Sequence, residues 1–222
     1  MLKSQRGSNA AGLENSIMLL CDIGNTTYHF FDGDKDYRKD AKLFDPSSVK
    51  DEVFYICVNP HIKEVLKSLE NWVDLSAYVD ISNYYETMGI DRIAACEAIE
   101  SGVIVDAGSA ITVDIVKNNK FEGGFIYPGI KAMSECYKNI SSALAYSFNF
   151  EVDLGKMPKN SCDAISYGYL KLLHNEVKSY DMDIYLTGGD APKFAKIFPD
   201  AYVDEMLIFK GMKNIMKKVG IC

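Results

Sequence analysis

The sequence of 222 residues predicts an α/β protein built from two related lobes. The first support is a pattern that occurs twice: an apolar, strand-like run, an aspartate, a glycine two positions later, and then small polar residues. The second is the order of elements, since each half begins with strand-like runs and continues with helix-like ones. The sequence contains no low-complexity segment or long linker, so we expect the lobes to pack closely on either side of a cleft.

The pattern in the second half spans residues 103–114. Residues 103–105 are apolar and β-branched, as is typical of a buried strand, and they lead into Asp106. Gly108 lets the chain reverse or approach a ligand closely, because it has no Cβ. Residues 111–116 then alternate with the period of a strand that leaves a hairpin. A carboxylate at such a turn, next to backbone N–H and hydroxyl donors, suits a metal-bound phosphate group.

The pattern in the first half spans residues 18–27, where an apolar run ends at Asp22 and Gly24 follows two positions later. A single Asp-x-Gly turn more commonly only closes a hairpin, with the aspartate capping backbone donors. Two copies, each at the end of a strand-like run, favour a duplicated arrangement that clamps ATP.

Composition and charge argue against several classes of protein. The formal net charge of −7 disfavours general nucleic-acid binding, and the lysine-rich segment 210–218 is typical of the solvated face of a terminal helix. No apolar run approaches the roughly 20 residues of a membrane-spanning helix. The six cysteines are scattered without C-x-x-C pairs, which indicates reduced, mostly buried thiols in a cytoplasmic protein.

Periodicity and turn signals predict the elements along the chain. Residues 1–16 are polar and aperiodic and are expected to be a leader or disordered extension. We expect an N-terminal lobe over 17–100 and a C-terminal lobe over 101–222. Strands are expected at 17–22, 26–31, 53–58, 103–105, 111–116, 120–127 and 183–186. Helices are expected at 62–69, 91–100, 130–146, 162–179 and 207–219.

Five short stretches together resemble one family. They are Asp-Ile-Gly-Asn-Thr at 22–26, Gly-Ile-Asp-Arg at 89–92, the segment 106–114, Gly-Gly-x-x-x-Pro-Gly at 123–129 and Thr-Gly-Gly at 187–189. In this order the chain resembles the type III pantothenate kinases of the actin and hexokinase-like ATPase superfamily. The resemblance implies two ribonuclease H-like lobes. It also implies transfer of the ATP γ-phosphate to pantothenate, giving 4'-phosphopantothenate in the first step of coenzyme A biosynthesis.

The resemblance assigns ATP and its ions to the two acidic turns. Asp22 would hold Mg²⁺ directly or through water, and Asp106 matches a position that the family uses for K⁺ or NH₄⁺. Ser109 replaces the family's usual threonine and keeps its hydroxyl for ATP. The implied phosphate-binding residues after Asp22 are Ile23, Gly24, Asn25, Thr26 and Thr27. The implied adenine-contacting residues are Gly188 and Gly189, although a lone Gly-Gly pair is more often an ordinary turn.

The segment 89–92 would bind and activate pantothenate. By resemblance Asp91 is the general base, Arg92 grips the substrate carboxylate, and Gly89 and Ile90 line the pocket. Without the resemblance, Asp91 and Arg92 would be a helix N-cap and a solvated charge in the first turn. Asp114 either supports the site from behind or is a surface carboxylate at a strand end.

Two segments depart from the family's pattern. The segment before Gly89 lacks the family's usual proline and offers both Tyr84 and Tyr85, of which Tyr85 is favoured for the substrate pocket. Either tyrosine could instead be packed aromatic surface. Ser161 replaces a threonine in a segment that reaches the neighbouring subunit's pocket in the family, which implies a homodimer. The ordinary interpretation of the segment around Ser161 is a helix N-cap.

Two alternatives to a pantothenate kinase stay open. One is a kinase for another small hydroxy acid, and the other is a regulatory homologue that has lost turnover. A filament-forming or chaperone-like ATPase is disfavoured, because the chain is short and has no evident peptide-binding domain.

Overall fold

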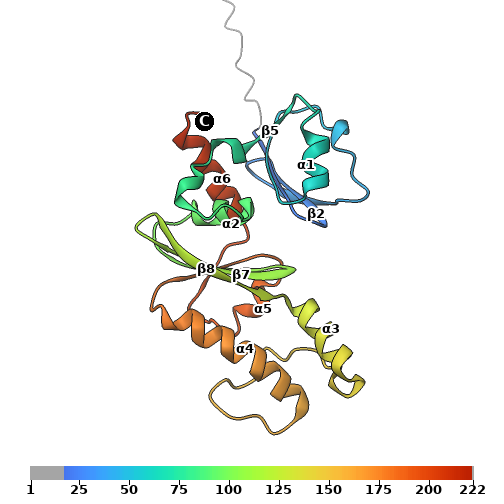
Figure 1. The fold of residues 1–222 in the computed structure, drawn as a ribbon, viewed down its shortest axis with the longest axis vertical. Coiled ribbons are helices and arrows are strands. Elements are labelled where there is room, and N and C mark those ends of the chain that lie inside the picture. The colour runs from blue at the N-terminus through green and yellow to red at the C-terminus, as the bar shows by residue number, and fades with distance from the viewer. Residues whose placement is uncertain (1–17, 222) are drawn as a thin grey trace, which may run out of the picture.

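Two five-stranded sheets and the helices around them make up the fold (Figure 1), which is a computed structural model that describes residues 18–221. The predicted leader at 1–16 lies outside the described residues. The first sheet contains β1 (Leu19–Ile23), β2 (Thr27–Phe31), β3 (Asp36–Asp40), β4 (Val53–Cys57) and β5 (Trp72–Asp74). The second contains β6 (Gly102–Ala107), β7 (Ala110–Lys117), β8 (Lys120–Pro128), β9 (Ile184–Thr187) and β10 (Tyr202–Val203).

Helices and short 3₁₀ turns connect and cover these strands. The helices are α1 (Pro60–Leu66), α2 (Ile90–Cys96), α3 (Ile130–Ile140), α4 (Ser161–Ser179), α5 (Ala191–Phe194) and α6 (Leu207–Lys218). The 3₁₀ turns are η1 (Pro46–Ser48), η2 (Leu75–Tyr78), η3 (Ile81–Asn83) and η4 (Ser142–Leu144). In the part of the chain that the structure describes, no helix is both long and apolar enough to cross a bilayer.

The two sheets have the same topology. Their strand orders are β3-β2-β1-β4-β5 and β8-β7-β6-β9-β10. In each, the first three strands along the chain pair antiparallel, and the last two add in parallel beside the first strand. The prediction of two related α/β lobes is therefore confirmed, and the repeated Asp-x-Gly pattern marks equivalent strands, β1 and β6.

Strand alternation puts the two aspartates on corresponding faces. In β1, Leu19, Cys21 and Ile23 belong to a core cluster with the aromatic residues of β2, whereas Leu20 belongs to a different cluster with α6. Successive side chains of a strand point to opposite faces, so Asp22 shares the face of Leu20. In β6, Ile104 packs towards α2 and Asp106 shares its face.

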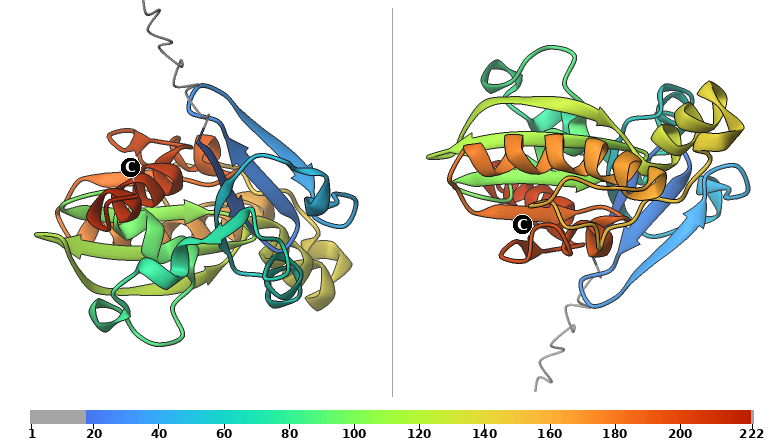
Figure 2. Two further views of the ribbon diagram at one scale, coloured as in Figure 1. Left: turned by 90° about the horizontal axis from the view of Figure 1, so that it is seen from above. Right: turned by 90° about the horizontal axis from the view of Figure 1, so that it is seen from below.

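The helices α2 and α6 hold equivalent positions after β5 and β10, and they lie side by side between the sheets (Figures 1 and 2). Phe209 and Met212 of α6 pack with Leu20 of the first sheet, although α6 follows the last strand of the second. The helices approach closely at Gly211, where a Cβ would collide with the carbonyl oxygen of Ala94. Each lobe thus contributes to the core beneath the other.

Several predicted boundaries were wrong for local reasons. The helix expected at 91–100 begins at Ile90 with Gly89 as its N-cap and ends at Cys96. The helix expected at 130–146 ends at Ile140, because Ser141 adopts an extended conformation with φ −163° and ψ 139° and caps the separate turn η4. Three short strands and one short α-helix were not predicted: β3, β5, β10 and α5. Strand β3 has the sequence DYRKD and is exposed throughout, so it has no apolar alternation that would reveal it.

Candidate active site

Both acidic turns open onto one cavity of about 560 Å³ between the lobes. From the first half it is lined by Asp22, Gly24, Thr26 and Thr27. From the second half it is lined by Asp106, Ser109, Gly188 and Gly189, among others. The expectation that the two turns face one another across a cleft agrees with this geometry.

Two residues of the first acidic turn, Ile23 and Asn25, do not line the cavity. The Ile23 side chain is fully buried in the first sheet's core, so only its backbone can face a ligand. Asn25 is exposed and is not among the residues that line the cavity. The turn itself is closed by Gly24, whose N–H donates to the carbonyl oxygen of Thr27 at 3.0 Å.

The carboxylates of Asp22, Asp91 and Asp106 converge from three elements. Burial, followed by the charges of Asp91 and Asp106, raises the pKa of Asp22 to about 8. Burial, followed by the charge of Asp91 and then that of Asp114, raises the pKa of Asp106 to about 7. Like charges in a low-dielectric site disfavour ionisation of one another, so this cluster is one that a bound cation would stabilise.

The oxygen atoms of this site fit cations that take most of their ligands from water or substrate phosphates. Within residues 18–221, no group of three or more His, Cys, Asp or Glu side chains is arranged to hold a metal. Mg²⁺ commonly binds one or two carboxylates and completes its shell with water and substrate phosphates, which suits Asp22. Thr112 lies opposite Asp106 in the β6–β7 register, and its buried hydroxyl has no hydrogen-bond partner. Asp106 with this oxygen suits a cation that prefers oxygen ligands.

Asp91 lies in the first turn of α2, folded back over the helix N-terminus. Its Oδ1 accepts the N–H of Arg92 at 2.8 Å, and a Cβ on Gly89 would collide with that same oxygen. Glycine at 89 therefore leaves room for the Asp91 carboxylate. Burial raises the pKa of Asp91 above its ordinary value, although the N–H of Arg92 opposes the shift.

Arg92 is not a solvated charge. It is 5% exposed, and its Nε and Nη2 donate to Oδ2 and Oδ1 of Asp114 at 3.0 and 2.5 Å. Asp114 is 1% exposed, which excludes the alternative that it is a surface carboxylate. The pair joins α2 to β7, and Gly124 of β8 leaves space for it, because a Cβ there would collide with Asp114.

The two tyrosines before Gly89 have different environments. The Tyr85 hydroxyl accepts a hydrogen bond from Nη1 of Arg92, and the guanidinium carbon lies 5.6 Å from the Tyr85 ring centre. The Tyr84 hydroxyl donates to Glu97 at 3.0 Å, at the other end of α2. Tyr85 is thus the tyrosine that contacts the Gly-x-Asp-Arg segment.

The second acidic turn is enclosed by backbone. Gly188 has φ +84°, and a Cβ there would collide with Asp106 Oδ1 and lie 2.7 Å from the carbonyl oxygen of Ala107. Gly129, just before α3, leaves room for the carbonyl oxygens of Gly108 and Ser109. Glycine at 188 is required by both its backbone angle and this close approach.

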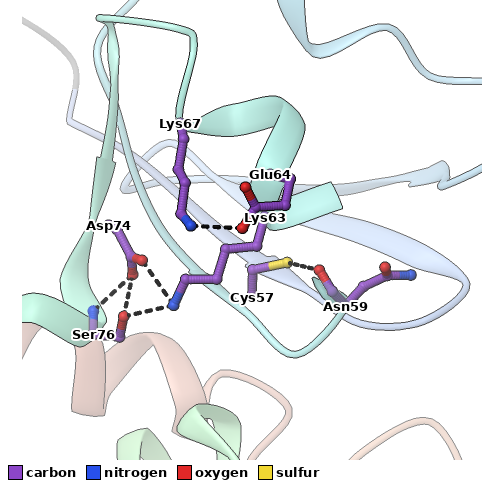
Figure 3. A network of polar contacts seen from close by, with 7 residues as sticks. All are labelled: Cys57, Asn59, Lys63, Glu64, Lys67, Asp74 and Ser76. Carbon is purple, nitrogen blue, oxygen red and sulfur yellow. Dashed lines mark hydrogen bonds and ion pairs between the residues drawn. The ribbon is translucent and has the colours of Figure 1, made fainter. Parts of the chain in front are cut away.

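A second cavity of about 310 Å³ adjoins the Gly-x-Asp-Arg segment and is lined by Gly89 and Ile90 together with Lys63 and Ser76. Lys63 Nζ lies 2.9 Å from Asp74 Oδ2 and donates to the Ser76 hydroxyl at 3.0 Å (Figure 3). Burial would raise the pKa of Asp74, but hydrogen bonds from Ser76 and Lys63 outweigh it and lower that pKa. This wall of the cavity is a fixed, internally neutralised polar network.

Ser161 lies away from the central cavity. It is exposed at the first position of α4, and the N-cap is its neighbour Asn160, whose side chain accepts the N–H of Asp163 at 2.9 Å. Ser161 is not among the residues that line the 560 Å³ cavity.

Further cavity-lining residues were not predicted, among them His29, Arg38, Lys131 and Glu205. His29 Nε2 lies 2.7 Å from Asp36 Oδ2. The strand-like period of 26–31 placed His29 on the same face as Thr27, but nothing in the sequence indicates that β3 pairs beside it.

With this geometry in place, comparisons with known proteins identify the family. The sequence profile of the type III pantothenate kinases matches residues 47–180. A type III pantothenate kinase of Sulfurimonas denitrificans is 73% identical over 92% of this chain and 100% of its own length. One from Campylobacter jejuni is 44% identical over 90% of this chain and 97% of its own. This chain belongs to the type III pantothenate kinase family.

Solved structures agree on the fold. A crystal structure of a Campylobacter jejuni protein, described as a Baf family transcriptional activator, superposes with a TM-score of 0.84 at 43% identity, over 92% of this chain and 100% of that one. A Sinorhizobium meliloti protein described as a 2-dehydro-3-deoxygalactonokinase superposes with a TM-score of 0.54 at 9% identity, over 91% of this chain and 96% of that one, which shows the fold alone. The chain therefore shares its fold with both of these proteins.

Proposed function

We propose that this type III pantothenate kinase family member transfers the ATP γ-phosphate to the primary hydroxyl of pantothenate, giving 4'-phosphopantothenate in coenzyme A biosynthesis. The observation that carries the proposal is that Asp22 and Asp106 line one cavity between the lobes, with Asp91 near enough for its charge to raise the pKa of both. Phosphoryl transfer requires positioning and neutralisation of charge more than covalent chemistry, and this cavity offers both.

Asp91 acts as the general base. As the pantothenate hydroxyl oxygen attacks the γ-phosphorus, its proton passes to an Asp91 carboxylate oxygen, and ADP leaves. The raised pKa of Asp91 makes its carboxylate a better proton acceptor than an ordinary aspartate. The Asp91 carboxylate accepts a hydrogen bond from the backbone N–H of Arg92, and this bond holds the carboxylate in place at the start of α2.

Two cations complete the site. Asp22 would hold Mg²⁺, and Asp106 would hold K⁺ or NH₄⁺; when bound, these ions neutralise phosphate charge. Thr26, Thr27 and Ser109 line the cavity, and their hydroxyls would donate to phosphate oxygens. Gly188 and Gly189 present bare backbone to the adenine ring.

Pantothenate binds beside Gly89 and Ile90, against Arg92 and Tyr85. Asp114 and Tyr85 take up three of the five guanidinium N–H donors of Arg92, which leaves two for the substrate carboxylate. Ser161 would reach this pocket from a second copy in a homodimer. The exposed apolar side chains of Ile126 on β8 and Ile140 on α3 support such a contact. We propose a cytoplasmic location with its substrates.

The test is turnover by Asp91→Asn, measured as pantothenate-dependent ADP release. We expect kcat to fall by about 10²- to 10⁴-fold with ATP binding nearly intact, because only the proton acceptor is lost. Glu100→Gln is the matched control, since it removes one carboxylate just beyond α2, where Glu100 is exposed. Near-wild-type turnover of Asp91→Asn would refute the base assignment.

One observation gives weight to a regulatory role, namely the description of the Campylobacter jejuni structure as a transcriptional activator. The same assay separates the possibilities. A catalytically silent regulator would release no ADP with pantothenate, and a kinase for another hydroxy acid would release ADP faster with that acid than with pantothenate.

A further inference from the structure

Three residues form a row across the first sheet. Asp22 of β1 lies opposite His29 of β2, and His29 lies opposite Arg38 of β3. Residues directly opposite in neighbouring strands project from the same face, and all three line the central cavity. Neighbouring strands are about 4.8 Å apart, so the backbones of Asp22 and Arg38 are about 10 Å apart. The row therefore puts a guanidinium within side-chain reach of the space above Asp22.

Arg38 is the free cation of this row. The ring of His29 is held between Asp36 and Phe209, with Nε2 at 2.7 Å from Asp36 Oδ2 and ring centres 4.8 Å apart. Arg38, by contrast, makes no side-chain hydrogen bond or ion pair with another residue of the described chain 18–221. Its charge opposes the burial that raises the pKa of Asp22, which is consistent with a guanidinium near that carboxylate.

A charge on an edge strand commonly serves only to block pairing with other chains. Strand β3 is at the edge of the first sheet, and its Lys39 fits that role. Lys39 lies opposite Tyr28, whose side chain belongs to the core cluster of Leu19, Cys21 and Ile23. The Lys39 Nζ lies 5.8 Å from the Tyr37 ring centre. Arg38 points the other way, into the cavity. Its position is therefore not explained by edge protection.

A second cation faces the cavity from the other lobe. Lys131, in the first turn of α3, lines the cavity next to the second acidic turn and, like Arg38, has no ion-pair partner within residues 18–221. Lys193 also lies nearby, but it is paired with Asp190 at 2.7 Å. Arg38 and Lys131 are thus cavity-lining cations from the two lobes that form no ion pair with a carboxylate of residues 18–221.

We propose that Arg38 and Lys131 bind the phosphate tail of the nucleoside triphosphate from the two sides of the cleft. This inference rests on the proposed use of ATP. The cavity walls carry the carboxylates of Asp22, Asp106 and Glu205, so a polyanion needs cations from the protein as well as bound metal. The guanidinium of Arg38 can contact two phosphate oxygens at once, while Lys131 supplies a point charge.

The test is binding of a non-hydrolysable ATP analogue with Mg²⁺, measured by calorimetry. Arg38→Gln is expected to weaken binding by about 10- to 100-fold and Lys131→Gln by about 3- to 10-fold, because each loses a charge-assisted contact. Both variants should bind AMP within about twofold of wild type, because AMP lacks the β- and γ-phosphates. Arg38→Lys should recover part of the loss.

The matched controls remove equal charges nearby. The first control is Lys39→Gln, since Lys39 is next to Arg38 but on the opposite face of β3. The second is Lys138→Gln, since Lys138 is two turns beyond Lys131 on α3, with its Nζ 3.8 Å from Glu135 Oε2. Both should bind the analogue like wild type. Wild-type-like binding by Arg38→Gln and Lys131→Gln would overturn the inference, as would an equal loss for AMP or equal losses in the controls. A wild type that does not bind the analogue would overturn it too.

Steady-state turnover separates this inference from the proposed function. The expected result is a raised KM for ATP in Arg38→Gln, with the KM for pantothenate within about twofold of wild type. A wild type that binds the analogue but releases no ADP with pantothenate would contradict the proposed function and leave the phosphate contacts standing. Normal pantothenate turnover with an unchanged KM for ATP in both variants would contradict the phosphate contacts alone.

Discussion

The two acidic turns of this protein have the same pattern and different surroundings. Asp22 and Asp106 end equivalent strands, and in each turn the following glycine donates its N–H back across the turn, to Thr27 in one and Ala110 in the other. Around Asp22 the walls are side chains, including His29 and Arg38. Around Asp106 the walls are largely backbone, because Gly188 lies against its carboxylate and Gly129 lies against the carbonyl oxygens of Gly108 and Ser109.

The difference teaches that the repeated pattern determines where a carboxylate lies, whereas the neighbouring strands and loops determine what it can bind. The open first turn leaves room for a hydrated metal and phosphate oxygens. The enclosed second turn, with the unpartnered Thr112 hydroxyl nearby, suits a cation held by oxygen atoms of the protein. The two aspartates should therefore differ in how their loss affects activity.

The largest expected effect is the loss of kcat when Asp22 or Asp106 is replaced by asparagine, and this loss should differ between the two. Asp22→Asn should lower kcat by about 10³-fold or more under all salt conditions, because the proposed Mg²⁺ ligand is lost. Asp106→Asn should lower kcat by about 10- to 100-fold and remove the dependence on K⁺. ADP release with and without K⁺ measures both. The comparison would be broken if Asp106→Asn kept a dependence on K⁺, or if the two variants lost kcat equally.

A pair of glycine variants tests the enclosure of the second turn. Gly188→Ala should cost about 1 to 3 kcal/mol of folding stability and lower activity, because alanine is strained at φ +84° and its Cβ collides with Asp106. Gly24→Ala should change stability by less than about 0.5 kcal/mol, since the nearest atom to its Cβ is the Thr27 carbonyl oxygen at 3.8 Å. Denaturant unfolding checks both, and equal destabilisation would contradict the difference.

The last prediction concerns the pH dependence of stability. The pKa values of Asp22 and Asp106 are about 8 and about 7 in the folded protein and ordinarily 3.8, so the folded state binds more protons between these values. Stability of the metal-free protein should therefore fall as pH rises through this window, by up to about 1.4 kcal/mol per pH unit for each of the two carboxyl groups, and level off above it. Calorimetric melting at a series of pH values measures this. Asp22→Asn should reduce the dependence of stability on pH. Stability that increases with pH in the wild type would contradict the prediction.

The parts of the fold and site that the sequence predicted are those encoded locally. Asp22 and Asp106 could be placed because each ends an apolar strand, and the repeat implied that the two strands are equivalent. The Arg92–Asp114 pair could not be derived, because it depends on how α2 docks on β7, and Asp114 stayed ambiguous until its burial was known. Arg38 was missed for a similar reason, since β3 is charged and exposed and only its register with β2 brings it to the cavity.

The crossing of α2 and α6 has a consequence for how the chain folds. Each helix is connected to one sheet and buries apolar side chains with residues from the other half, and at Gly211 they touch with no room for a side chain. A fragment cut between the halves would leave its own sheet without its cover and its helix without a partner. The duplicated chain is thus a single cooperative folding unit.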